Sequence, residues 1–178
     1  MPLKILPPSL EEYAPFYADY IQRAIDRGDI LSALAAQPEE MKNALGRLSD
    51  QQARFRSGPE EWSIKEIISH LIDGERVFSY RLLRISRKDK TPLPGFEQVD
   101  YVRESIADEL PITDLLDEFE YLRRANALAI RHMTEEAVSQ TGIASGAAIS
   151  ARALIHILVG HVEHHMTSLQ EKYLPGIS

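Results

Sequence analysis

Four long stretches of this chain repeat apolar side chains at the spacing of an α-helix, and this repetition limits the fold more than any other feature of the sequence. The stretches cover residues 29–48, 63–86, 113–133 and 150–173. Apolar residues three and four positions apart line one face of a helix, and such faces are buried against one another. No segment alternates apolar and polar residues clearly enough to predict a strand. The pattern therefore predicts an all-α fold built as a four-helix bundle.

Capping side chains mark where several of these stretches begin. Asp29 precedes the first stretch, and Ser63, with the glutamate three residues later, forms a capping box at the second. We expect Thr113 or Asp114 to cap the third helix. Pro38 falls inside the first stretch, which is either one kinked helix or two helices that meet. We favour one kinked helix.

The remaining segments are connections and one extension. Residues 1–28 form an N-terminal extension, in which we predict a turn and then a helix over 15–27 that packs on the main body. The longest connection, 87–112, joins the second and third helices, runs along or across the bundle, and includes a short helical turn near 98–105. Residues 140–149 are rich in Gly, Ala and Ser, which indicates a loop or a small hairpin. All 178 residues are expected to form a single domain.

Charge and composition exclude several classes of function. The formal net charge is −7, from 20 basic and 27 acidic residues, which argues against binding of nucleic acid through its phosphates. The chain has no cysteine, so disulfides, thiolate ligands and a cysteine nucleophile are excluded. No run of about 18 apolar residues predicts a membrane span, and the N-terminus lacks the apolar core of a signal peptide. We therefore expect a cytoplasmic protein.

Histidines on the last helix are the strongest functional signal. His161 and His165 fall on its apolar stripe, four residues apart, so that their rings are about 6 Å apart along the helix axis. His164 lies at the edge of the stripe, and His156 is expected on an outer face. His70, on the flank of the buried face of the second helix, is the best third ligand for a metal ion. The alternative is a set of core histidines whose hydrogen bonds are satisfied within the protein.

Four residues are candidates for supporting roles around these three histidines. Gly74 lies one turn after His70, which suggests clearance for a ligand or for a closely packed helix. Glu75 and Asn126 each interrupt an apolar stripe. Glu75 is either a general base or, as we prefer, half of a buried ion pair with a nearby arginine. His164 competes with His165 for the metal and is otherwise a candidate for the rim of the pocket.

Several segments together resemble motifs of the DinB/YfiT-like superfamily. They are Trp62-Ser63-Ile64-Lys65-Glu66, His70-Leu71-Ile72-Asp73-Gly74-Glu75-Arg76, Thr91-Pro92-Leu93-Pro94-Gly95-Phe96 and Gly160-His161-Val162-Glu163-His164-His165. The resemblance covers roughly residues 29–173. It implies a four-helix bundle in which His70, His161 and His165 hold a divalent metal ion, and it implies a homodimer.

The same resemblance implies an enzyme that acts on a small molecule. Related branches include proposed metal-dependent hydrolases and enzymes that use low-molecular-weight thiols, as S-transferases or as a maleylpyruvate isomerase. A hydrolase or a thiol S-transferase is therefore expected here. The alternatives are a non-catalytic module that binds a metal or ligand, and a metal-free bundle whose histidines line an apolar pocket. We prefer Zn or Ni as the metal, while Fe, Mn or Cu also suit imidazole ligands.

Overall fold

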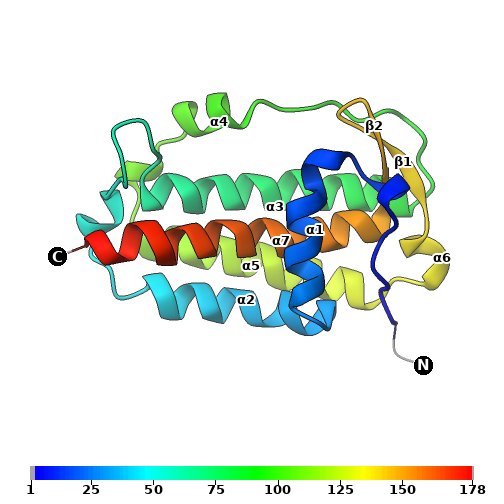
Figure 1. Cartoon of the computed structure of the whole chain (residues 1–178), viewed down its shortest axis with the longest axis horizontal. Helices are drawn as coiled ribbons and strands as arrows, with labels where there is room; N and C mark the ends of the chain where they lie inside the picture. The colour runs from blue at the N-terminus through cyan, green and yellow to red at the C-terminus, as the bar shows by residue number, and fades with distance from the viewer. Residues whose placement is uncertain (1–2, 178) are drawn as a thin grey trace.

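Four long helices form the body of the protein. The structure, a computed structural model, describes residues 3–177 and is mostly helical (Figure 1). The long helices are α2 (Ile30–Leu45), α3 (Ile64–Ser86), α5 (Ile112–Arg131) and α7 (Ala151–Ser168). Helices α2 and α3 each pack against both α5 and α7. The predicted four-helix bundle is confirmed.

The apolar side chains of the bundle gather in two clusters along its length. Helix α7 contributes Val159 to one cluster and Val162 to the other. Helix α3 likewise contributes Phe78 to the first cluster and Ile72 to the second. The residues between these positions on both helices, His161 among them, therefore lie where the two apolar clusters meet.

Capping side chains begin three of the long helices, and two of these caps, Asp29 and Ser63, were predicted. Asp29 accepts a hydrogen bond from the Ser32 backbone N–H at 2.8 Å, and Ser63 forms the predicted capping box of α3. The Ser150 side chain accepts from the N–H of the third residue of α7. Helix α2 continues through Pro38, so the first stretch is one helix, as we favoured.

The predicted start of the third long helix is wrong by two or three residues, because the N-cap position is Pro111 and not Thr113 or Asp114. Helix α5 begins at Ile112, and neither Thr113 nor Asp114 caps it. Instead, the Ile112 N–H donates to the Asp50 carboxylate at 2.8 Å. A side chain from another segment thus satisfies an N–H group that the helix itself leaves without a partner.

The N-terminal extension packs across α7. It consists of two 3-10 turns, Leu10–Glu12 and Pro15–Tyr17, and α1 (Ala18–Asp26), which crosses α7 in Figure 1. A Cβ atom at Gly160 would lie 1.8 Å from the Tyr20 carbonyl oxygen. Only glycine therefore allows α1 to approach α7 this closely.

The connections contain short elements of their own. These are the 3-10 turns Gln52–Arg54 and Ala107–Glu109, α4 (Gln98–Glu104), α6 (Glu135–Val138), and the antiparallel strands β1 (Thr141–Ala144) and β2 (Ala147–Ser150). After α7, the chain continues as a π-helix, Leu169–Tyr173, and a 3-10 turn, Leu174–Gly176. The hairpin pairs Thr141 with Ser150 and Ala144 with Ala147. The long connection between α3 and α5 runs alongside α3 and carries α4, as predicted (Figure 1). Within residues 3–177, no helix has the length and apolar character needed to cross a membrane.

Candidate metal centre

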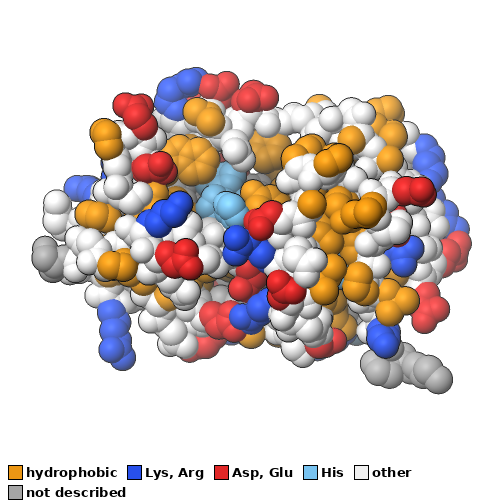
Figure 2. Space-filling model, viewed as in Figure 1, with side chains coloured by type: hydrophobic (Ala, Val, Ile, Leu, Met, Phe, Trp, Pro, Cys, Tyr) orange, Lys and Arg blue, Asp and Glu red, His pale blue; other side chains and the backbone are white. Residues whose placement is uncertain are grey.

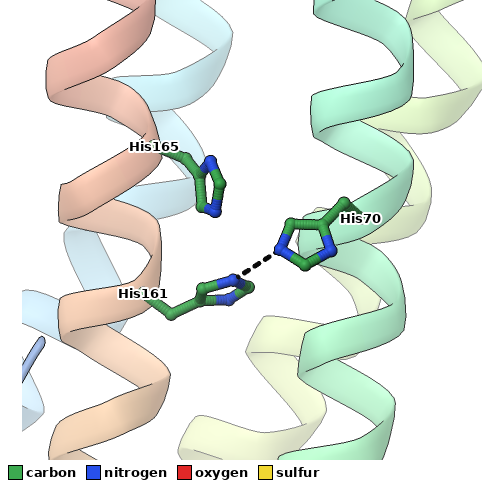
Figure 3. A group of neighbouring side chains, drawn as sticks. All are labelled: His70, His161 and His165. Carbon is green, nitrogen blue, oxygen red and sulfur yellow. Dashed lines mark hydrogen bonds between the residues drawn. The ribbon is translucent and has the colours of Figure 1, made fainter. Parts of the chain in front are cut away.

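Three histidines from two helices point toward one another (Figure 3). His70 comes from α3, and His161 and His165 come from successive turns of α7. The nitrogen atoms that could act as ligands all lie within 4.8 Å of one another. The Nε2 atoms of His70 and His161 are 2.9 Å apart. His70 and His161 are buried and His165 is half-buried. The structure thus brings together the three residues that the sequence singled out.

Local geometry explains why the rings converge. The four-residue spacing puts His161 and His165 on one face of α7. Across from them, Gly74 gives the His161 ring its space, because a Cβ atom there would lie 2.7 Å from His161 Cε1. Of the two reasons considered for this glycine, the structure supports close packing against a neighbouring helix, because the space is filled by the His161 side chain of α7.

The three rings are held in the neutral form. Burial, together with the neighbouring His164, lowers the pKa of His70 to about 4. Burial, His70 and His164 lower the pKa of His165 to about 3. The pKa of His161 lies well below its usual range, because of burial first and then the positive forms of the other histidines and Arg123. Neutral imidazoles are the form that binds metal ions at neutral pH.

Glu75 forms the buried ion pair that we preferred. Its carboxylate accepts from Arg123 Nε at 3.0 Å and from Arg123 Nη2 at 2.7 Å, and both side chains are almost fully buried. Asn126 donates to the same carboxylate at 2.8 Å. Gln37 also accepts a hydrogen bond from Arg123, and this partner was not predicted. Glu75 and Asn126 therefore belong to a polar network inside the bundle and not to the pocket beside the histidines.

Of the other three histidines, one lies beside the cluster and two lie outside it. His164 is half-buried, with its Nδ1 atom 3.1 Å from the Asp19 carboxylate. His132 is exposed at the C-terminus of α5, as expected. The expectation for His156 was wrong: it is buried, and its Nδ1 atom lies 2.8 Å from the Arg152 carbonyl. The N-terminal extension covers this side of α7, where Glu12 pairs with Arg152.

A pocket of about 530 Å³ opens beside the histidines. Its lining residues come from the N-terminal extension, α3, α7, the long connection and the hairpin, and they are Phe16, Tyr17, Tyr20, His70, Phe78, Arg81, Gly95, Phe96, Glu97, Gln98, Ser145 and His161. Figure 2 shows histidine side chains at the bottom of a hollow that is bordered by hydrophobic side chains. The sequence alone indicated only the histidines of this pocket, because its other walls come from segments far apart in the chain.

The fold and the cluster define a class of protein, a helical bundle with a candidate three-histidine metal site between two of its long helices. The family model of the DinB superfamily matches residues 33–169, so the chain belongs to the DinB superfamily. A relative from Geobacillus thermodenitrificans, whose name proposes a metal-dependent hydrolase, is 24% identical over 149 residues, which are 83% of this chain and 84% of that protein.

Two solved structures share the fold. YfiT from Bacillus subtilis, described as a proposed metal-dependent hydrolase with an unusual four-helix bundle topology, superimposes with a TM-score of 0.73 at 16% identity, over 91% of this chain and 92% of YfiT. A mycothiol-dependent maleylpyruvate isomerase superimposes with a TM-score of 0.65 at 14% identity. That match covers 79% of this chain and 59% of the isomerase.

Proposed function

We propose that this protein is a metal-dependent hydrolase that acts on a small molecule, with His70, His161 and His165 as ligands of one divalent ion. The observation that carries the proposal is the convergence of three neutral imidazoles within 4.8 Å. Zn or Ni suits this donor set best, and Fe, Mn or Cu is compatible with it. The names of the Geobacillus relative and of YfiT also support a hydrolase.

The donor set fits a catalytic site better than a structural one. Structural zinc sites are closed by four protein ligands, whereas catalytic sites have three and an open position. Within residues 3–177, the cluster offers three side chains as ligands, and two of them line the pocket. When bound, a divalent ion lowers the pKa of a bound water molecule and polarises the substrate. The pocket therefore supports an enzyme over a non-catalytic module.

His164 is the residue of the chain that we propose as a proton carrier. Its ring lies beside that of His165, with centroids 5.0 Å apart, and Asp19 fixes one of its nitrogens. A carboxylate that orients a histidine in this way is a common feature of general bases. Glu75, the other candidate, is already engaged by Arg123 and Asn126.

The test is hydrolysis of a panel of esters and amides by metal-free protein and by the same protein after addition of Zn²⁺ or Ni²⁺. We expect turnover only with metal, and its loss in His161→Ala. The exposed His132→Ala is the matched control and should retain activity. Metal-loaded protein that hydrolyses no member of the panel would argue against a hydrolase.

A thiol-dependent S-transferase is the second candidate, because the bundle is similar to that of the mycothiol-dependent isomerase. This chain spans only 59% of that enzyme, and so the hydrolase is preferred. Adding a low-molecular-weight thiol to the same assays separates the two activities. A turnover that requires the thiol would support the transferase.

We expect Gly74→Ala to weaken Zn²⁺ binding about tenfold while the protein remains folded. The added methyl group would displace the His161 ring, and disturbing the orientation of a ligand typically costs 10–100-fold in affinity. Alanine also favours a helix over glycine by about 1 kcal/mol, so the helix itself is not weakened. Competition with a chelator measures the affinity, and circular dichroism checks the fold.

The matched control is Gly58→Ala, in a turn outside the site, where the new atom would contact only the flexible Glu61 side chain at 3.3 Å. Equal affinities of Gly74→Ala and the parent would contradict the role assigned to this glycine.

We also propose a homodimer formed through the face of α3 and α5. Tyr80, Leu83, Tyr121 and Leu128 are large apolar side chains of these helices that are at least half exposed. A pocket of about 670 Å³, lined by Tyr80 and Leu83 among others, lies between the two helices. Exposed apolar surface of this kind marks interaction sites. Light scattering should give twice the 20.1 kDa of the chain, and a mass of one chain would contradict the dimer.

A further inference from the structure

Arg81 is a buried cation that pairs with no carboxylate in the part of the chain that the structure describes. Among the described residues, three cationic side chains are almost completely buried, with 2% of Arg81, 0% of Arg123 and 1% of Lys65 exposed. Arg123 pairs with Glu75 at 2.7 Å, and Lys65 pairs with Asp50 at 2.8 Å. Within residues 3–177, no carboxylate forms an ion pair with Arg81. Because a buried charge is costly unless it is paired, this arginine differs from the other two.

The protein contacts of Arg81 are neutral, and they include the Phe96 ring, whose centroid lies 5.9 Å from the guanidinium carbon. Nη2 donates to the Pro94 carbonyl at 2.8 Å and to the Ser145 hydroxyl at 2.9 Å. The Tyr17 hydroxyl lies beside the group: burial raises the pKa of Tyr17, and Arg81 opposes that rise. A guanidinium carries five N–H donors, so these contacts leave donors for a ligand.

The remaining donors of Arg81 are accessible from the pocket. Among the described residues, no fully buried side-chain nitrogen or oxygen is without a hydrogen-bond partner. The guanidinium nitrogens that donate to no protein acceptor are therefore in contact with solvent. This solvent is in the pocket, because Arg81 lines the pocket together with His70 and His161. Glu97 lines this pocket too, but it is exposed and forms no ion pair with Arg81.

The hairpin turn that contacts Arg81 has an unfavourable backbone conformation. The backbone of Ser145 has a φ of +52°, and residues other than glycine, asparagine and aspartate seldom adopt such a positive φ. Such strain persists where the surrounding structure holds it, often at functional sites. Here the turn places the Ser145 hydroxyl against Arg81, so that the hydroxyl holds the guanidinium at the wall of the pocket.

We propose that Arg81 binds an anionic group, a carboxylate or a phosphate, of the small molecule on which the histidine site acts. The inference rests on the proposed function, because it names the substrate class for the same pocket. His70 and Arg81 are eleven residues apart on α3, roughly 16 Å along the helix. The anionic group therefore binds away from the histidines, and the aromatic side chains of Phe16, Phe78 and Phe96 contact the body of the molecule.

Calorimetric titration of metal-free protein with benzoate, phenyl phosphate and the neutral benzamide tests this inference. We expect one or both anions to bind and benzamide to bind at least tenfold more weakly. Arg81→Gln should weaken binding of the anion at least tenfold, because a charge-assisted hydrogen-bonded pair is lost. The relative affinities of benzoate and phenyl phosphate tell which anion the site prefers. Failure of both anions to bind the parent would overturn the inference.

The matched control is Arg76→Gln, on the same helix but outside this pocket, where Arg76 pairs with Glu118 at the surface. It should bind the anions as the parent does. Arg81→Lys retains the charge but not the fork of donors, so its affinity should fall between those of the parent and of Arg81→Gln. Equal binding by the parent and by folded Arg81→Gln would overturn the inference.

If Arg81→Gln does not fold, nuclear magnetic resonance of the parent decides the question. The Arg81 Nε–H signal, identified by its loss in Arg81→Lys, should move on addition of the anion that binds and not with benzamide. An unmoved signal would overturn the inference.

His161→Ala separates this inference from the proposed metal function. If this variant binds the anion as tightly as the parent does, the Arg81 site stands even if the proposed metal function fails. Metal binding without anion binding would reject only the present inference.

Discussion

His161→Ala should lower the affinity of the protein for Zn²⁺ or Ni²⁺ by more than about a hundredfold. The His161 ring contacts the rings of both His70 and His165, with centroids 4.8 Å apart in each case. Removing a partner that only orients a ligand already costs 10–100-fold in affinity, and so removing the ligand itself should cost more. Competition with a chelator of known affinity measures the change.

His70→Ala and His165→Ala should lower the affinity for the metal as His161→Ala does. His132→Ala should bind metal as the parent does, because His132 lies exposed at the end of α5. Each variant is compared by circular dichroism to confirm that it is folded. An affinity of folded His161→Ala within threefold of the parent would mean that His161 is not a ligand.

Glu75→Ala should be the most destabilising single change in the polar network. It would leave the Arg123 guanidinium, which is fully buried, without its carboxylate. Breaking a buried ion pair from one side typically costs about 3–5 kcal/mol of unfolding free energy, because the remaining charge has no counterion. Urea denaturation followed by circular dichroism measures this loss.

The matched comparison is Glu118→Ala, which removes the surface pair between Arg76 and Glu118. Exposed pairs contribute about 0–1 kcal/mol, so that variant should unfold close to the parent. The double variant Glu75→Leu/Arg123→Met should recover much of the stability lost by Glu75→Ala, since no unpaired charge remains. A loss below about 1 kcal/mol for Glu75→Ala would show that the pair is not needed for folding.

The sequence predicted the helices well because their signals are local. Apolar spacing marked the four long stretches, and the caps at Asp29 and Ser63 marked two helix starts. The start of α5 was missed because its first N–H is satisfied by Asp50, 62 residues away. No pattern near Ile112 indicates that contact.

The site was predictable only in part, for the same reason. His70, His161 and His165 could be selected from helix periodicity and from the resemblance to a known family. His156 was misjudged because the periodicity of α7 does not show that the N-terminal extension covers its outer face. Arg81 could not be selected either, because its partners come from the long connection and the hairpin.

The metal content of the untagged parent protein decides whether the three histidines form a metal site. Elemental analysis after exhaustive dialysis should give about one divalent ion per chain, or reach that value after titration with Zn²⁺ or Ni²⁺ and removal of the excess. A parent protein that is purified without metal and takes up neither ion would contradict the account. The three histidines would then be a polar network in the core of the bundle, and the pocket would belong to a metal-free protein.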